Sequence, residues 1–332
     1  MRSSGRPTMV DVAAAAGVSL KTVSRVINDH PNVDRAMTDR VNDAVARLGY
    51  HRNAVAASLR SGSRDTIGFV SADLANTVYM QIAAAMSSVA VGRGHQVVIA
   101  SSEEDPAAER RLALDFCQRR VGGLVLVPTS SDHSYLAPEV AHGTPVVFLD
   151  RPGHGIPADS VLIDNRGGAR AAVGELLGEG HRRIAMLLDS ADIFTMAERR
   201  DGALEAFALA GRRPDPDLAV MGLHTPTAAR EAMDRLLDSS DPPTAVFCGN
   251  NRATIGALQA ILPRDAEVAV TGFDDFEMSE LLPRRVRIVA YDVTELGALA
   301  ATILLDRIAE GAPADGGTRY VPTRLVDRGG RA

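Results

Sequence analysis

Residues 8–28 read TMVDVAAAAGVSLKTVSRVIN, and this stretch decides the fold of the N-terminal region. Thr8 and Asp11 have the spacing of a helix capping box, with aspartate in place of the usual glutamate or glutamine. Gly17 interrupts the alanine-rich helix that follows, and Ser19 is suited to cap a second helix. The stretch therefore predicts two short helices that are separated by a tight turn.

A third helix is expected after a polar loop at residues 28–32. Val41, Val45 and Leu48 recur on one face of this helix, and Gly49 is placed to end it. The first fifty residues thus read as a small unit of three helices.

The charge of the chain is unevenly distributed. Residues 1–64 carry ten basic side chains against five aspartates, a net charge of +5, whereas the rest of the chain carries 26 basic and 37 acidic side chains, a net charge of −11. The overall charge of −6 argues against a nucleic acid partner by itself. A basic region joined to an acidic body indicates instead a localised site for a polyanion such as DNA.

From residue 66 onward, short β-rich apolar runs alternate with alanine-rich helical stretches. Such runs are typical of parallel strands that are covered by helices on both faces, and the length of this part allows two similar lobes. A ligand is then expected in the crevice at the carboxyl ends of the strands. The predicted strands cover residues 66–70, 96–100, 123–128, 145–150, 160–164, 183–188, 245–249, 267–272 and 287–291.

Several classes of protein are disfavoured. No apolar run approaches the roughly 20 residues of a membrane span, and the N-terminus lacks the apolar core of a secretory signal, so we expect a cytoplasmic protein without membrane contact. Cys117 and Cys248 lack metal or redox spacing and are expected to be buried thiols. Because no phosphate loop, nucleophile elbow, zinc helix or dinucleotide fingerprint is present, we expect no catalytic residue, no metal and no cofactor.

The segment 8–28 strongly resembles the head of the LacI/GalR family of bacterial transcription regulators. Six further segments resemble landmarks of that family and occur in the family's order, which leaves little room for coincidence. They are RNAVAASLRSGSRDTIGFV (52–70), GHRRIAMLL (180–188), RRDGALEAF (199–207), TAVFCGNN (244–251), VAVTGFDD (268–275) and PTRLVDRGG (322–330).

The resemblance implies an N-terminal all-α helix-turn-helix head and a two-lobed α/β effector domain with parallel sheets, like that of periplasmic binding proteins. We place the DNA-binding domain at residues 1–50, a hinge with a short helix near 54–59 at residues 51–65, and the effector-binding and dimerisation domain at residues 66–332. The short helix is below the roughly 12 residues needed for marginal stability alone, so it should form only when packed.

A helix that reads the major groove must present polar and methyl groups while its other face packs. In the second helix, Val23 and Val26 can face inward while Leu20, Lys21 and Arg25 project outward. By resemblance these three outward residues read the bases. The residues expected to contact the DNA backbone are Ser19, Thr22, Ser24 and Asn28.

The hinge is expected to supply a second DNA contact in the minor groove. By resemblance, Leu59 of each subunit inserts near the centre of the operator, Ala56 allows close approach, and Asn53 caps the hinge helix or touches the backbone. Because one small reader buries little surface, we expect a homodimer on a near-palindromic operator.

Polar residues that follow the predicted strands are candidates for contacts with an effector, expected to be a sugar or a sugar derivative. Some of them have an alternative role, since Asp and Asn after strands often cap helices or bridge lobes. The chain has no tryptophan, so an aromatic platform must come from Tyr79, Phe276 or another smaller ring. By resemblance, the positions of Asp150, Arg199, Asn250 and Asp274 reach the bound effector, and we expect Arg199 to open a helix. The full set of candidates is Asp73, Asn76, Tyr79, Asp150, Arg199, Asn250 and Asp274.

Two departures from the family pattern bear on this site. Asn251 stands where the family usually has aspartate, so the role of this position is open, and residues 76–79 replace the usual Asn-Pro-Phe-aromatic sequence. The sugar can therefore not be named by analogy.

The sequence is interpreted as that of a sequence-specific transcription regulator, a repressor under allosteric control by the effector. The alternatives are a constitutive DNA-binding dimer without a ligand, an enzyme on a doubly wound fold, and a periplasmic solute-binding protein. The absent catalytic motifs oppose the enzyme, and the basic reader opposes the periplasmic protein.

Overall fold

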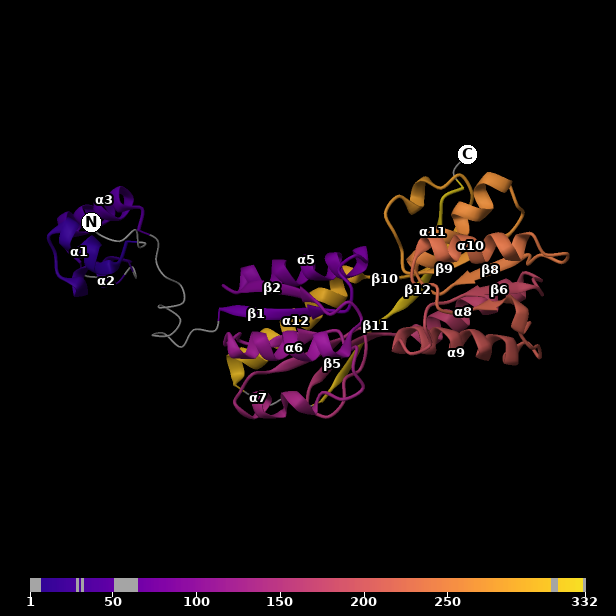
Figure 1. Ribbon diagram of the computed structural model, residues 1–332, viewed down its shortest axis with the longest axis horizontal. Helices are drawn as coiled ribbons and strands as arrows, with labels where there is room; N and C mark the ends of the chain where they lie inside the picture. The colour runs from indigo at the N-terminus through magenta and orange to yellow at the C-terminus, as the bar shows by residue number, and fades with distance from the viewer. Residues whose placement is uncertain (1–6, 28–29, 31–32, 51–64, 312–315, 331–332) are drawn as a thin grey trace. The chain divides into compact units, whose positions relative to one another are not determined.

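The computed structural model describes residues 7–27, 30, 33–50, 65–311 and 316–330 (Figure 1). The chain forms two compact units, Met1–Arg64 and Asp65–Ala332, which are described separately below. The predicted hinge helix at 54–59 lies outside the described residues.

The first unit contains the three predicted helices, α1 (Met9–Ala16), α2 (Leu20–Ile27) and α3 (Arg35–Leu48). The predicted capping box of α1 is present in both directions, because Thr8 accepts a hydrogen bond from the Asp11 N–H and Asp11 accepts one from the Thr8 N–H. The seven buried residues of its core come from all three helices and from Tyr50, two residues beyond the end of α3: Val12, Ala16, Val23, Val26, Val41, Ala44 and Tyr50.

Two glycines and one arginine side chain complete the ends of these helices. Gly17 and Gly49 adopt left-handed φ angles of 62° and 60°, which glycine reaches without steric cost. Arg40 of α3 donates from Nη2 to the carbonyl oxygens of Ala16 and Gly17 at 2.5 and 3.0 Å. Two carbonyls at the end of α1 are thereby satisfied, and α1 is joined to α3.

The second unit consists of two lobes, each built on a six-stranded sheet (Figure 1). The strand order is β11-β5-β4-β3-β1-β2 in the N-terminal lobe and β12-β10-β9-β8-β6-β7 in the C-terminal lobe. The strands of the N-terminal lobe are β1 (Thr66–Ser71), β2 (Gln96–Ser101), β3 (Leu124–Leu126), β4 (Val146–Leu149), β5 (Asp159–Ile163) and β11 (Thr318–Val321). Those of the C-terminal lobe are β6 (Ile184–Leu187), β7 (Ala219–Val220), β8 (Ala245–Cys248), β9 (Ala269–Phe273), β10 (Val286–Tyr291) and β12 (Thr323–Arg328).

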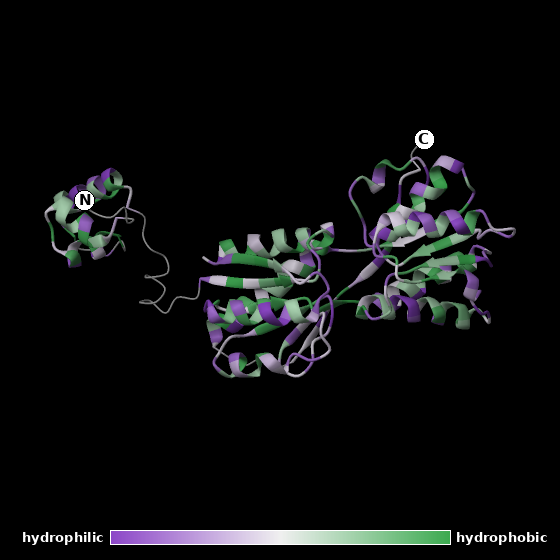
Figure 2. Ribbon diagram, in the orientation of Figure 1, coloured by the Kyte–Doolittle hydropathy of each residue, from purple (hydrophilic) through white to green (hydrophobic). Residues whose placement is uncertain are grey.

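Helices cover both sheets, as expected for parallel strands that are buried on both faces. Figure 2 shows the strands as mainly hydrophobic ribbons between helices of mixed polarity. The N-terminal lobe contains α5 (Thr77–Gly92), α6 (Pro106–Gln118), α7 (Ala137–Ala141) and α12 (Val293–Glu310), and the C-terminal lobe contains α8 (Asn165–Gly178), α9 (Phe194–Leu209), α10 (Pro226–Leu237) and α11 (Asn251–Ile261). Short 3₁₀ turns lie at Ser134–Leu136, Pro216–Leu218, Leu262–Arg264 and Ser279–Leu281.

The two-lobed, largely parallel architecture and all nine predicted strands are confirmed. Within the described residues the chain passes between the lobes after β5, after β10 and between β11 and β12. The strands β7, β11 and β12 were not predicted, because they lie at sheet edges and lack continuous apolar runs. The pair β10–β12 is antiparallel, an exception to the parallel pattern.

Both cysteines are buried as predicted, and burial raises the pKa of the Cys117 and Cys248 thiols to about 12. No helix in the described part of the chain combines the length and the apolarity needed to span a bilayer. Among the same residues, no group of three or more His, Cys, Asp or Glu side chains is placed to hold a metal ion.

Close packing of α8 on α9 predicts opposite effects for two glycines. A Cβ on Gly202 of α9 would lie 2.2 Å from the backbone oxygen of Arg166, whereas a Cβ on Gly174 of α8 would meet nothing within 4 Å. We expect Gly202→Ala to lower the free energy of unfolding by about 1–3 kcal/mol through overpacking. The control Gly174→Ala should raise it by about 0.5–1 kcal/mol. Denaturant unfolding measures both, and equal effects would contradict the packing described.

Candidate functional site

The helix α2 begins with a cap formed by Ser19. The Thr22 N–H donates to Ser19 Oγ over 3.1 Å, and the two hydroxyl oxygens are 2.9 Å apart. Ser19 is exposed, while Thr22 and Ser24 are half-buried. These predicted backbone contacts thus lie at the start of α2 and on its flank. The fourth predicted backbone contact, Asn28, and the predicted minor-groove residues Asn53, Ala56 and Leu59 lie outside the described residues.

The two faces of α2 differ as the sequence predicted. Val23 and Val26 are buried in the core of the first unit. Leu20, Lys21 and Arg25 are exposed on the opposite face, and Leu20 is 49% exposed although it is apolar. The structure therefore gathers the three predicted base readers on one accessible surface of one helix.

The second unit has a cleft between its lobes, at the carboxyl ends of strands from both sheets. About 610 Å³ of space that no atom occupies, part of it open solvent, lies among the side chains that line this cleft. All seven predicted effector residues line this cleft: Asp73, Asn76, Tyr79, Asp150, Arg199, Asn250 and Asp274.

Arg199 is the most extensively bonded side chain of the cleft. It is 3% exposed, and its guanidinium group forms a two-pronged ion pair with Asp274 at 2.8 and 3.1 Å. Nε donates to Asn165 Oδ1 at 2.8 Å and Nη1 donates to the Gly249 oxygen at 2.7 Å. The guanidinium carbon lies 3.6 Å from the centre of the Phe273 ring, a cation–π contact. Four of the five N–H groups are thereby engaged.

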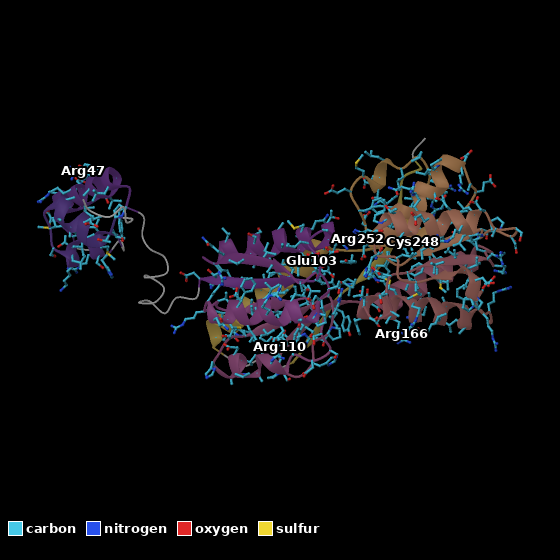
Figure 3. The ribbon with its side chains drawn as sticks, in the orientation of Figure 1. Arg47, Glu103, Arg110, Arg166, Cys248 and Arg252 are labelled. Atoms are coloured by element: carbon cyan, nitrogen blue, oxygen red, sulfur yellow. The ribbon has the colours of Figure 1, made fainter. Side chains whose placement is uncertain are left out.

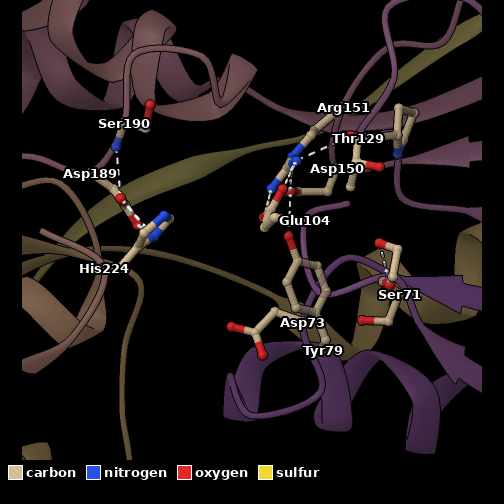
Figure 4. Close-up of polar contacts among 12 residues, drawn as sticks. Ser71, Asp73, Tyr79, Glu104, Thr129, Asp150, Arg151, Asp189, Ser190 and His224 are labelled. Carbon is tan, nitrogen blue, oxygen red and sulfur yellow. Dashed lines mark hydrogen bonds and ion pairs between the residues drawn. The ribbon is translucent and has the colours of Figure 1, made fainter. Parts of the chain in front are cut away.

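Asp150 is a buried carboxyl group opposite this pair. Tyr79 Oη donates to its Oδ2 over 3.0 Å (Figure 4). Burial raises the pKa of Asp150 above its ordinary value, and the nearby guanidinium groups of Arg151 and Arg199 oppose the rise without cancelling it. Asp150 also has a left-handed φ of 67°, a costly conformation for aspartate that is concentrated at functional sites.

A second ion pair in the cleft was not predicted. Arg151 binds Glu104 through both terminal nitrogens, at 2.7 and 2.5 Å, and also donates to the Pro128 oxygen at 3.1 Å. The Arg151 Nε is buried, has no hydrogen-bond partner in the described part of the chain, and lies 3.8 Å from Asp150 Oδ2. The position of Arg151 directly after Asp150 was a usable signal in the sequence, whereas nothing marked Glu104.

Two contacts join the lobes across the cleft. Arg252 Nη2 lies 2.7 Å from Asp73 Oδ2, and Figure 3 places Arg252 where the lobes meet. Asn251 Nδ2 donates to Asn76 Oδ1 over 3.2 Å. The role of Asn251, left open by the sequence, is therefore a bridge between the lobes. An ionised aspartate at this position would have no hydrogen to donate.

Two of the predicted effector residues also cap helices, which is the alternative that the sequence left open. Asn76 Oδ1 accepts the Val78 N–H at 3.2 Å at the start of α5. Asn250 Oδ1 accepts the Ala253 N–H at 2.8 Å at the start of α11. The Nδ2 donors of Asn250 remain available to a ligand.

Several details of the cleft differ from expectation. The helix α9 begins at Phe194, so the prediction that Arg199 opens a helix was wrong; Arg199 lies more than one turn inside it. Phe276 packs on the core of the C-terminal lobe, and the second aromatic ring of the cleft is Tyr291. His224, which was not among the candidates, also lines the cleft, with Nδ1 2.9 Å from the Asp189 carboxylate (Figure 4).

The raised pKa of Asp150 predicts that Asp150→Asn stabilises the folded protein by an amount that depends on pH. The asparagine keeps an oxygen that can accept the hydrogen bond of Tyr79. A raised folded-state pKa contributes stability that is complete below the unfolded value of about 3.9 and is lost as the pH rises through the folded value. The variant should therefore melt higher at neutral pH, by roughly 2–4 °C for each kcal/mol, with a smaller gain in acid. Thermal melts from about pH 4 to pH 8 measure this, and a gain that is independent of pH would contradict the burial of a costly carboxylate.

Comparisons with known protein families and structures match both units of the chain. Residues 8–53 match the family of bacterial regulatory proteins of the lacI type, and residues 173–330 match a periplasmic binding protein-like domain. The transcriptional regulator CelR of Thermobifida fusca is 32% identical over 97% of this chain and 95% of its own length. Among solved structures, the lac repressor dimer bound to operator and an anti-inducer has a TM-score of 0.85 at 27% identity, covering 99% of this chain and all of that one. A complex of CelR with cellobiose has a TM-score of 0.70 at 30% identity, covering 97% of this chain and 98% of that one.

The matches to CelR and to the lac repressor extend over nearly the whole chain, so they include both the head and the two-lobed unit. The relatives named above are transcription regulators, and the family model that matches the head is one of bacterial regulatory proteins. The chain belongs to the LacI family of bacterial regulatory proteins and is a DNA-binding transcription regulator.

Proposed function

We propose that this protein is a cytoplasmic repressor whose affinity for a near-palindromic operator is controlled by a sugar or sugar derivative bound in the cleft. The observation that carries the proposal is the convergence of all seven predicted effector residues on one cleft between two lobes. The lac repressor bound to operator and CelR bound to cellobiose support it as related examples.

In this proposal, the exposed face of α2 reads the operator. Arg25 can bind a guanine with two hydrogen bonds, Lys21 adds charge and a donor, and Leu20 provides an apolar contact to a thymine methyl. Ser19, Thr22, Ser24 and Asn28 position the helix on the phosphates. The hinge residues Asn53, Ala56 and Leu59 contact the minor groove.

A homodimer is supported by apolar side chains that the second unit leaves exposed. β2 is an edge strand of the N-terminal sheet and packs beside α5, and apolar residues project to solvent from both elements. An exposed edge with apolar side chains is a liability unless a partner covers it. The residues concerned are Met80, Val91, Val98 and Ile99 in the N-terminal lobe and Met278 and Leu281 in the C-terminal lobe.

Control of DNA binding follows from the position of the cleft. A ligand that contacts both lobes changes the free energy of their closure, which the Arg252–Asp73 and Asn251–Asn76 contacts already favour. A coupling of about 1–3 kcal/mol would change operator affinity about 5- to 150-fold. The competing function is a constitutive dimer whose cleft has no physiological ligand.

Band-shift titrations test the switch. We expect at least one sugar that raises the melting temperature of the protein to change its affinity for a duplex selected from random sequences, about 5- to 150-fold. If ligands that bind leave the affinity for that duplex unchanged, the switch is refuted and the constitutive dimer is favoured.

Arg25→Ala tests the assignment of the reading surface. Loss of a two-bond contact to guanine should cost about 1–3 kcal/mol of discrimination between the selected duplex and a scrambled one, without changing ligand affinity. Arg213→Ala removes an exposed arginine of the C-terminal lobe and is the matched control. Equal binding of both duplexes by the parent protein, or equal loss in the control, would contradict the assignment.

A further inference from the structure

The cleft is unusually rich in charge yet offers no free cation. Among the described residues that line it, five carboxyl groups accompany three guanidinium groups and one imidazole. The carboxyl groups belong to Asp73, Glu104, Asp150, Asp189 and Asp274, and the guanidinium groups to Arg151, Arg199 and Arg252.

Each guanidinium group of the cleft is already paired with a carboxylate. Arg199 and Asp274 are bound through two contacts and their side chains are only 4% and 8% exposed. Arg151 and Glu104 are also bound through two contacts. The third pair is the bridge between the lobes. To meet a cation whose charge is not already compensated, an incoming phosphate or carboxylate would have to displace a carboxylate from one of these pairs, and its own charge would meet an excess of acidic groups.

The polar groups of the cleft that remain suit hydroxyls, each of which donates one hydrogen bond and accepts up to two. Arg199 keeps one N–H, Asn250 keeps its Nδ2 donors, and Asp150 Oδ1 can accept. The Thr195 hydroxyl, which also lines the cleft, can do either. A neutral polyol satisfies such a mixture without leaving a buried charge unpaired.

We propose that the cleft selects uncharged polyhydroxyl ligands and excludes their phosphorylated and carboxylated counterparts, and that Glu104 is the residue that sets this selectivity. The inference rests on the proposed function of the cleft as an effector site. Glu104 is assigned because its side chain, 28% exposed, neutralises a guanidinium group that is 6% exposed at the wall of the cleft. Without Glu104 the two terminal nitrogens of that buried guanidinium would lose their carboxylate, and Asp150, 3.8 Å from Nε, would remain as the neighbouring acidic group.

Calorimetric titration of the full chain with sugars that differ only in charge tests the proposal. The pairs are glucose with glucose 6-phosphate and gluconate, ribose with ribose 5-phosphate, and cellobiose with cellobionate. We expect the free sugar of any binding pair to bind about 100-fold or more tightly than its anion, since a buried unpaired charge costs several kcal/mol. In Glu104→Gln this ratio should fall at least about tenfold, because the Arg151 guanidinium becomes available to the anion.

Two further variants keep the test decisive. Glu205→Gln removes a carboxylate that pairs with Arg166 and Arg170 away from the cleft, and it should leave the ratio unchanged. Asp274→Asn frees Arg199 instead and should shift the ratio in the same direction as Glu104→Gln, so a folding defect in one variant does not end the experiment.

The outcomes separate this inference from the proposed function. An anion that binds the parent protein more tightly than its neutral sugar overturns the charge selectivity while the effector site stands. An unchanged ratio in a folded Glu104→Gln protein overturns the role of Glu104. A nucleoside that binds where no sugar does overturns the polyol class. If no member of any pair and no nucleoside binds, it is the proposed effector site that fails.

Discussion

The cleft depends on one buried guanidinium group, that of Arg199. Its four hydrogen bonds join α9 to the start of α8, to the end of β8 and to the end of β9. Removing one partner from a buried ion pair typically costs about 3–5 kcal/mol, because the remaining charge is left uncompensated. The carboxyl ends of the strands in the C-terminal lobe are therefore held in one arrangement before any ligand arrives, and the polar groups of the cleft are preorganised.

The two polar contacts across the cleft are more exposed than the Arg199 network within the C-terminal lobe, and this difference suits the proposed switch. The Arg252–Asp73 pair keeps about a fifth of each side chain in solvent, which screens it more than the Arg199–Asp274 pair. The Asn251–Asn76 hydrogen bond adds about 0.5–1.5 kcal/mol. A ligand with a few hydrogen bonds to both lobes can therefore outweigh these contacts, whereas it could not rearrange the Arg199 network.

The first unit follows a different principle, because its DNA-facing surface is set locally. Burial of Val23 and Val26 fixes the rotation of α2 about its axis, and this rotation alone exposes Leu20, Lys21 and Arg25. In the proposed function this exposed face reads the bases, and the hinge and the dimer add to that contact. Control by a ligand is assigned to the second unit, where we propose that pairing of every guanidinium group in the cleft with a carboxylate selects uncharged ligands.

The sequence by itself predicted the three helices of the head, nine strands and seven of the polar residues that line the cleft. The helices and strands follow from local patterns, since helix caps and apolar runs are readable within a few residues, whereas the cleft residues followed from the ends of the predicted strands and from the family resemblance. Only the tertiary structure decided the partners. Glu104 lies 47 positions from Arg151, and Asn251 lies 175 positions from Asn76. The edge strands β11 and β12 likewise needed the sheets against which they pair. Partners of this kind depend on which distant side chains and strands the fold brings within a few ångströms of each other. A local sequence pattern carries no information about such distances.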